Sequence, residues 1–431
     1  MSLVILSAII FIPAVFLAWR ATKNILSPVF ISMGIFFFFY VGGLIYFVTD
    51  NHPLTPLYFS IGALFYGLGA FIIAGFFRFK PDTELKDFKQ KPLLNIFPSK
   101  KIFFISLIVI FVFSIALTFY YFYYVGIPLF QSSKVTTIAH GGKGIFFRGF
   151  TTFLPLILLV TYLFRKTTKK LSVKFFWWTI IITSLASIIL YGSRGIVLVF
   201  LMPFILLYSL FRVKRDLSKI GIVFLFFVLV AVSFQYSYPE YQKLSIKDSF
   251  VNVFNRMTVS QAMGMDYAIY NLVPDEDLYM GKKSMSDFKG FLSTLRIISQ
   301  GELFSERLFE KINFNYEGEA RLTISTTSIG DLYIDFSLIG IAFGMFFYGV
   351  IAQGLYVKVV RGVKDCFLLV VYSYLQYILI ATHIGGAIFS ALANMGISLI
   401  MFIIIIASIN IFLLLPLSVG RMSLRLSKHF I

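Results

Sequence analysis

The chain has 431 residues, of which 58% are hydrophobic and only 13% are charged. Soluble domains carry about 25% charged residues, so this composition excludes an ordinary soluble protein and favours a membrane protein. The formal net charge is +18, a value that nucleic-acid-binding proteins also reach. The single cysteine, Cys366, excludes an internal disulfide and a multi-cysteine metal site.

The chain begins with an apolar stretch, residues 2–19, that we expect to remain as a membrane span. No basic segment precedes it and no small-residue cleavage site follows it, so it differs from a signal peptide. About 20 apolar residues suffice to cross a hydrocarbon core of about 30 Å, and none of the apolar segments alternates as a barrel strand would. Eleven spans are predicted: 2–19, 28–48, 57–77, 102–125, 145–164, 175–191, 196–211, 220–237, 328–357, 366–382 and 387–415.

Basic residues are concentrated in alternate loops between these spans. Cytoplasmic loops collect Lys and Arg, so we predict that the N-terminus lies outside and the C-terminus inside. The positive charge then faces anionic lipid of the inner leaflet, and no nucleic-acid partner is expected. Most of the 38 Lys and Arg lie in 20–27, 78–101, 165–174, 212–219, 358–364 and the C-terminal tail.

These features predict an all-α, polytopic transmembrane bundle of about 11 spans with a large, partly helical external loop. Residues 1–237 hold spans one to eight, 238–327 form the loop, and 328–431 hold the last three spans and a basic tail. Long ordered loops tend to be functional. Within the loop, 248–273 is expected on the membrane surface and 290–312 over the mouth of the bundle. No inverted repeat is evident, which argues against the common transporter layout.

The stretch "YGSRGIVLVF" places Arg194 between two apolar segments, at the predicted outer end of the sixth span. Gly192 and Gly195 flank it and the next span begins at once, so we expect a helix hairpin near the outer interface. A guanidinium binds phosphate with two parallel hydrogen bonds, which favours an anion site. The alternative is an arginine that extends to the interface and pairs with a lipid headgroup.

Three further arginines are predicted at outer span edges or in the external loop: Arg148 in "GIFFRGF", Arg256 in "FNRMT" and Arg321 in "EARLTIS". Each one alone is equally well explained as a solvated surface side chain. Together with Arg194 they suit a clamp for a pyrophosphate, because cations stabilise the charge that develops on a phosphate leaving group.

The stretch "STTSIGDLYIDF" opens the ninth span with hydroxyl side chains that suit a helix N-cap. Asp331 and Asp335 follow four residues apart and so share one helix face. Acids in this position are favoured by the helix dipole; alternatively, Asp331 is a base or a hydrogen-bonding group for a sugar hydroxyl. His383, beside a Gly-Gly break, and His140, in the first external loop, are candidate bases or hydrogen-bonded structural side chains.

Sequence motifs for metal, nucleotide or serine chemistry are absent: the chain has no HExxH, no Walker loop, no GxSxG and no CxxC. The "DED" at 275–277 is similar to the metal-binding DxD of nucleotide-sugar transferases. It falls on the predicted outer side, where nucleotide sugars are not supplied, so a loop cap explains it better. We therefore expect no metal and no cofactor.

Three stretches carry a family resemblance: "YGSRGIVLVF", "YYVGIPLF" after span four, and "TTSIGDLYIDFSLIGIAFGMFFYG" after the large loop. They resemble the Wzy-type polymerases of oligosaccharide repeat units, which build O-antigen of lipopolysaccharide and capsule. The span number, the long external loop and the basic inner loops resemble the same family. O-antigen ligases share this layout and differ in the acceptor, so both remain open, and a flippase for lipid-linked oligosaccharides is the rival from another class.

The resemblance implies a multi-pass glycosyltransferase of the bacterial cytoplasmic membrane, with a GT-C-like fold and an active site facing outward. It implies transfer of a growing glycan from undecaprenyl pyrophosphate to a repeat unit on a second carrier, without metal, and a chain-length regulator as a further partner. The site residues it suggests are Arg194 and Arg256 on pyrophosphate, Arg148 and Arg321 on the second carrier or the glycan, and Asp331 or His383 as base.

Overall fold

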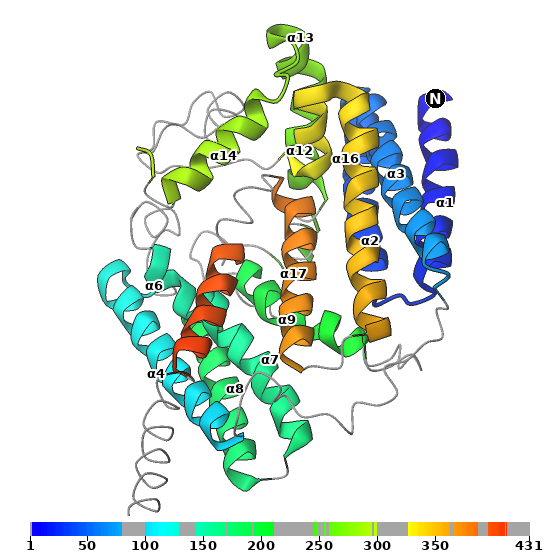
Figure 1. Cartoon of the computed structure of the whole chain (residues 1–431). Helices are drawn as coiled ribbons and strands as arrows, with labels where there is room; N and C mark the ends of the chain where they lie inside the picture. Colours follow the sequence, from blue (N-terminus) through cyan, green and yellow to red (C-terminus); the bar gives the residue numbers. More distant parts are fainter. Residues whose placement is uncertain are drawn as a thin grey trace, which may run out of the picture.

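The computed structural model describes residues 2–79, 100–128, 144–168, 170–191, 194–210, 258–294, 297–299, 326–362, 366–386 and 395–409, with a few single positions between 245 and 255 and at 411. Every regular element in these ranges is a helix (Figure 1). The first part contains α1 (Ser2–Thr22), α2 (Pro28–Asp50), α3 (Leu54–Phe76), α4 (Lys100–Val125), α6 (Gly144–Arg148), the π-helix η2 (Gly149–Phe153), α7 (Leu154–Thr167), α8 (Leu171–Tyr191) and α9 (Arg194–Ser209). The second contains α12 (Val259–Tyr267), the π-helix η4 (Ala268–Leu272), α13 (Val273–Glu276), α14 (Lys282–Thr294), α16 (Thr327–Gly362) and α17 (Cys366–Gly385).

Eight helices among the described residues are long and apolar enough to cross a membrane, and they match eight of the predicted spans. The predicted spans 196–211 and 387–415 correspond to shorter apolar helices, Val197–Tyr208 and Ile397–Ile409, while 220–237 lies outside the described residues. The all-α, multi-pass membrane architecture is therefore confirmed. The span count of eleven and the orientation stay predictions.

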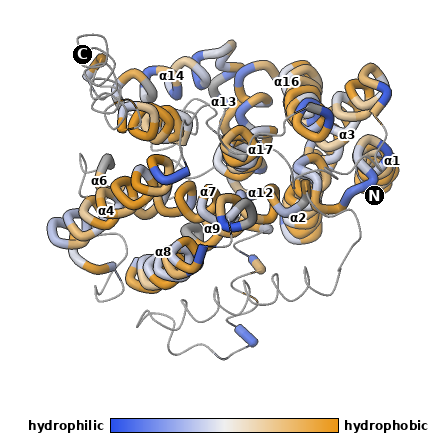
Figure 2. Tube along the Cα trace, turned by 60° about the horizontal axis from the view of Figure 1, so that its bottom comes forward, coloured by the Kyte–Doolittle hydropathy of each residue, from blue (hydrophilic) through white to orange (hydrophobic). Residues whose placement is uncertain are grey.

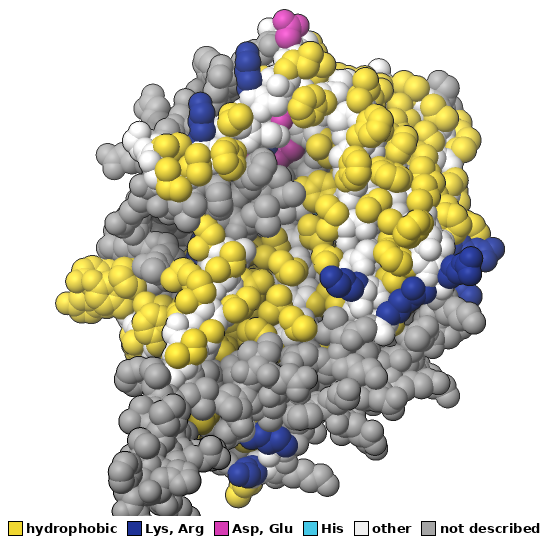
Figure 3. Space-filling view, viewed as in Figure 1, with side chains coloured by type: hydrophobic (Ala, Val, Ile, Leu, Met, Phe, Trp, Pro, Cys, Tyr) yellow, Lys and Arg dark blue, Asp and Glu magenta, His cyan; other side chains and the backbone are white. Residues whose placement is uncertain are grey.

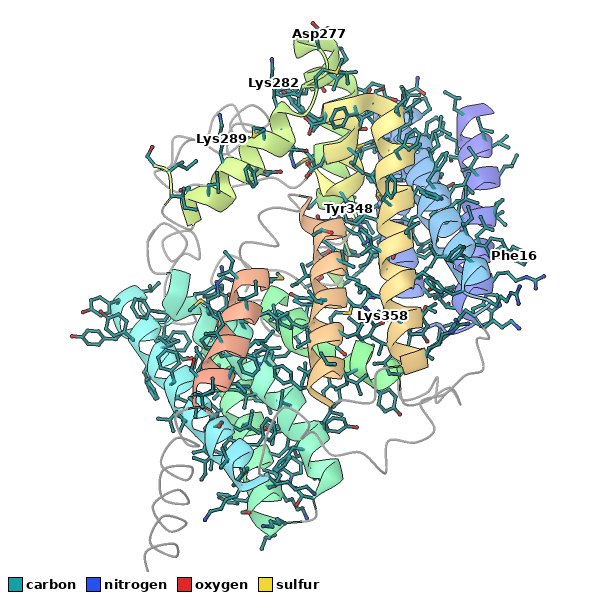
Figure 4. All side chains as sticks on the ribbon, viewed as in Figure 1. Phe16, Asp277, Lys282, Lys289, Tyr348 and Lys358 are labelled. Atoms are coloured by element: carbon teal, nitrogen blue, oxygen red, sulfur yellow. The ribbon has the colours of Figure 1, made fainter. Side chains whose placement is uncertain are left out.

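The helices are hydrophobic over most of their length (Figure 2). In Figure 3, hydrophobic side chains cover the side of the molecule where α1, α3 and α16 lie, with Lys and Arg at its lower end, and the charged side chains at the upper end lie where Figure 1 labels α13 and α14. Figure 4 labels Asp277, Lys282 and Lys289 at the end where α13 and α14 lie, and Lys358 toward the opposite end of α16. Such an apolar band between polar ends is what a lipid environment favours, since hydrocarbon accepts no unpaired charge.

The helices form two groups that meet at α17. In the first group α1, α2, α3, α12 and α16 enclose a core that includes the fully buried Phe36, Phe59 and Tyr66. In the second group α4, η2, α7, α8 and α9 enclose Phe103 and Phe150, also fully buried. Helix α17 packs on α2 and α16 at one side and on α7 and α9 at the other (Figure 1).

Two glycines let α3 and α16 approach closely. A Cβ added at Gly69 would overlap the carbonyl oxygen of Phe346, and one added at Gly349 would overlap that of Tyr66. Small residues at a membrane helix contact permit this backbone approach, which increases van der Waals packing where lipid offers no hydrophobic driving force. The pair therefore sets the spacing of the helix that carries the candidate site.

Helix α16 consists of two helices with opposite directions. Ser337 has non-helical torsions (φ 58°, ψ −150°) and separates a short arm, residues 327–336, from a long arm, residues 338–362. A Cβ added at Gly344 would lie 2.5 Å from the Leu332 side chain, although twelve residues span about 18 Å along a straight helix. The chain therefore reverses after the short arm, and Figure 1 shows the two arms side by side.

The described part of the large loop packs into the bundle. Ala262, Met265 and Ala268 are fully buried in the first core, and a Cβ added at Gly42 on α2 would lie 2.5 Å from the Thr258 carbonyl oxygen. The expected position of 248–273 on the membrane surface is therefore wrong for its described C-terminal part. Small side chains on α12 let it lie close to α2, and burial between helices removes its apolar face from water as effectively as lipid would.

Candidate functional site

The short arm and α14 cap each other. The backbone N–H groups of 279 and 280 donate to the carbonyl oxygens of 334 and 335, each at 3.0 Å. Carbonyls at a helix end lack partners within the helix. In return, the Asp335 carboxylate accepts from the backbone N–H groups of Lys283 (3.0 Å) and Ser284 (2.9 Å) at the start of α14. A carboxylate there also interacts favourably with the helix dipole.

Lys283 joins α14 to the short arm through two ion pairs. Its ammonium lies 2.7 Å from Oδ2 of Asp287, one turn later on α14, and also contacts Oδ2 of Asp331. Oδ1 of Asp331 accepts a hydrogen bond from the Thr326 hydroxyl. The side chains of Lys283 and Asp331 are 4% and 12% exposed. Lys283, Asp287, Asp331 and Asp335, which we call the Lys283 cluster, are thus largely shielded from water.

The Lys283 cluster contains one amine and three carboxyl groups, so negative charge is in excess. Burial alone would lower the pKa of Lys283, but Asp331 and Asp287 outweigh it and raise this pKa above its ordinary value. Burial raises the pKa of Asp287, and Asp331 and Asp335 add to that effect against the attraction of Lys283. The amine therefore keeps its proton at neutral pH, and Asp287 is easier to protonate than an ordinary aspartate.

His383 approaches the start of the short arm from α17. Its Nδ1 lies 3.1 Å from the Ser328 hydroxyl, one turn before Asp331. Gly386, just beyond α17, has φ +67° and donates its N–H to the Thr382 carbonyl at 2.9 Å, so the predicted Gly-Gly break is confirmed. A Cβ added at Gly386 would lie 2.6 Å from Oδ2 of Asp331. The two predicted base candidates thus lie around the first turn of the short arm.

The surroundings of the two candidates differ. The ring centroids of Phe36, Tyr348 and Tyr66 lie 4.9, 5.2 and 5.3 Å from that of His383, and His383 is 1% exposed. Asp331 lies where α14, α17 and the short arm meet. Because a base must reach its substrate proton, Asp331 is the better placed of the two.

Unusual backbone torsions occur at both ends of the short arm. Thr327 (φ 61°) and Ser337 (φ 58°) have positive φ, which L-residues rarely adopt and β-branched ones least of all. The Thr327 hydroxyl accepts from the Gly330 N–H at 3.3 Å, as the predicted N-cap requires. Strained residues persist where the surrounding structure holds them, and they cluster at functional sites.

Protein donors already occupy the oxygens of Asp331 and Asp335. Thr326 and Lys283 bond to Asp331, and the first turn of α14 bonds to Asp335. Within the described part of the chain, no group of three or more His, Cys, Asp or Glu side chains is arranged to hold a metal ion. The two carboxylates are therefore held in fixed positions by hydrogen bonds from α14, the short arm and the residue before it.

The predicted arginine clamp is only partly visible. Arg148 ends α6, is partly buried, and lies near Tyr374 of α17. Arg194 is the first residue of α9, and α8 ends at Tyr191. The predicted helix break at 192 and 193 lies outside the described residues. The side chain of Arg194 lies outside the described part of the structure, as do Arg256, Arg321 and His140 as a whole.

Sequence reasoning missed Lys283 and Asp287. Their spacing of four, with opposite charges, was a signal for a pair on one helix face. Nothing in the spacing indicates that Asp331, 48 residues further along, is the second partner. The hydrogen bond between His52 and Asp266 was also missed, because these two residues lie 214 positions apart in the sequence.

Comparison with known protein families gives one match, a model of O-antigen polymerases that covers residues 4–388. No curated protein and no solved structure matches the chain significantly. The matched residues include the short arm, α14 and α17, which form the site described above. O-antigen polymerases join repeat units carried on lipid, a glycosyltransferase-like activity that suits a multi-pass membrane protein. The chain belongs to the O-antigen polymerase family.

Proposed function

We propose that the protein lengthens glycans at the outer face of the bacterial cytoplasmic membrane. The donor is the growing chain on undecaprenyl pyrophosphate, and the acceptor is one repeat unit on a second undecaprenyl pyrophosphate. The Lys283 cluster carries this proposal, because it holds a partly accessible carboxylate, Asp331, on a strained short helix. The cluster lies at the end of the bundle where the predicted external loop packs (Figure 4).

The proposed step is a single glycosyl transfer. A hydroxyl oxygen of the acceptor sugar attacks the anomeric carbon of the donor, and the bond from that carbon to the pyrophosphate oxygen breaks. The electron pair leaves with undecaprenyl pyrophosphate. The hydroxyl proton passes to Asp331, whose position Lys283 and Thr326 hold. His383 supports the same turn through Ser328.

The negative charge of the leaving pyrophosphate needs a positive partner, and arginine side chains supply it. Arg194 and Arg256 bind the departing pyrophosphate, while Arg148 and Arg321 hold the second carrier or the glycan. The planar donor fork of arginine matches phosphate oxygens, so the reaction proceeds without metal. A chain-length regulator protein is a further proposed partner in the membrane.

The test is a reconstituted reaction. Purified protein in lipid nanodiscs receives synthetic undecaprenyl-pyrophosphate repeat units, with a chelator and without nucleotide sugars. We expect a ladder of longer lipid-linked oligomers, and a loss of at least 100-fold in rate for Asp331→Asn, on the scale of general base catalysis. Asp287→Asn, which removes the other carboxylate paired with Lys283, is the matched variant and should keep most of the rate.

Three results would overturn parts of the proposal. Transfer of glycan only to a lipid A core acceptor would identify a ligase. Movement of intact substrate across the bilayer without ladders would identify a flippase. A normal ladder from Asp331→Asn would remove Asp331 as the proton acceptor.

A further inference from the structure

We propose that His52, Asp266, Tyr270, Tyr58 and Tyr333 form a binding subsite for neutral sugar residues of the lipid-linked glycan, which we call the His52 subsite. Its members come from the turn between α2 and α3, from α3, from α12 and η4, and from the short arm. The inference rests on the proposed function for its ligand, the glycan, but it does not depend on whether Asp331 accepts the proton.

A buried carboxylate orients His52. Nδ1 of His52 lies 2.8 Å from Oδ2 of Asp266, and the Thr55 hydroxyl donates to Oδ1. The Asp266 side chain is 8% exposed and that of His52 is 28% exposed. A hydrogen bond from Nδ1–H to a carboxylate selects the tautomer in which Nε2 is the acceptor. The bond to Asp266 therefore fixes the orientation of a partly exposed imidazole ring.

Tyr270 extends this surface with a flat ring and a hydroxyl. Its ring stacks on that of His52 at 3.9 Å and 16°. The Tyr270 oxygen accepts from the Leu54 N–H at 2.9 Å, so its own proton is left to donate elsewhere. Burial raises the pKa of Tyr270, the Leu54 hydrogen bond opposes this, and the charge of Asp266 adds to it. The hydroxyl thus stays a donor at neutral pH.

Two further tyrosines connect this pair to the short arm. The ring centroids of Tyr58, on α3, and Tyr333, on the short arm, lie 5.2 Å apart. Tyr58 lies on the same helix as Leu54, whose N–H donates to Tyr270. Tyr333 follows Asp331 by two residues on the short arm, so the two side chains lie on different faces of the same short helix. The His52 subsite and the proposed reaction site therefore share the short arm.

The charge of the His52 subsite selects its ligand class. Its ionised group is Asp266, Asp50 adds negative charge nearby, and among the described contacts of these residues there is no Lys or Arg. Such a surface repels phosphate. A sugar instead offers hydroxyls to His52 and Tyr270 and apolar faces to the rings, the combination of aromatic walls and few polar groups typical of ligand sites. The lipid pyrophosphate is thus left to the arginines.

The same contacts also fasten α12 to the start of α3, so the test must separate binding from structure. Two substitutions of His52 do this. H52N places an amide nitrogen near the position of Nδ1, which keeps the bond to Asp266 and removes Nε2 and the ring. H52Q places its amide near Nε2 and loses the bond to Asp266. The probe is the repeat-unit oligosaccharide, released from its lipid by mild acid, titrated against the full chain in nanodiscs.

We expect H52N, which loses only the ring stack on Tyr270, to lower the unfolding midpoint less than H52Q does, and to bind the oligosaccharide at least tenfold more weakly. H52Q should lower the midpoint and lose less binding. Affinity for H52N within twofold of the wild type, or binding losses that follow the midpoint in both variants, would overturn the subsite. Asp331→Asn should bind the oligosaccharide normally, so failure of the base assignment would be seen separately in the polymerisation assay.

Discussion

Replacing Lys283 by methionine tests whether the Lys283 cluster holds α14 on the short arm. Methionine keeps much of the side-chain volume but leaves the Asp287 and Asp331 carboxylates without their cation. Breaking a buried ion pair by removing one partner costs about 3–5 kcal/mol. Because α14 is otherwise joined to the short arm mainly by caps, most of this loss should appear as local opening of α14 rather than global unfolding.

Hydrogen exchange of the α14 amides, followed by mass spectrometry in nanodiscs, measures this opening. A loss of 3–5 kcal/mol corresponds to exchange faster by about a hundredfold to several thousandfold. Lys282→Met, at the exposed neighbouring position, is the matched control and should change exchange little. Adding Asp287→Asn to Lys283→Met should recover part of the protection, because one unpaired charge is removed. Exchange within threefold of the wild type in Lys283→Met would refute the reasoning.

Two other predictions concern packing and pH. Gly69→Ala or Gly349→Ala places a methyl group against the facing backbone, which should cost about 1–3 kcal/mol and lower the thermal midpoint. Gly75→Ala is the control, because its added Cβ meets open space, and it should leave the midpoint unchanged. Equal midpoints for all three variants would contradict the close approach. The raised pKa of Lys283 means that its stabilisation is complete below the ordinary lysine value of 10.5 and is lost as the pH rises through the folded-state value. The difference in midpoint between wild type and Lys283→Met should therefore shrink above about 10.5, and a constant difference would count against the ion pairs.

Much of the fold was predictable from local sequence. The free energy of moving a span from water into lipid is a sum over the residues of that span. Hydropathy along the sequence was therefore enough to locate eight long helices. The end of α17 before Gly386 was predicted because glycine next to an apolar run ends a helix. The four-residue spacing of Asp331 and Asp335 correctly indicated a shared face, which α14 covers.

The errors have a common cause. The reversal at Ser337 leaves no mark in hydropathy, because both arms are apolar and serine is no strong breaker. The stretch ending α12 and η4 has an apolar face that suits a membrane surface and a helix bundle equally. Only the small residues facing α2 decide between them, and their partner at Gly42 lies more than 200 residues earlier.

By itself, the sequence determined that this protein is a multi-pass helical membrane protein and placed Asp331 at the start of a helix. The free energy of transferring a segment into lipid and the capping of a helix both depend on residues that are close together along the chain, so both can be predicted from the sequence. Only the tertiary structure decided that Lys283 neutralises Asp331, that His383 faces an aromatic core, and that His52 pairs with Asp266. These contacts depend on how helices distant in the chain pack, and pairing of buried charge is a property of that packing alone.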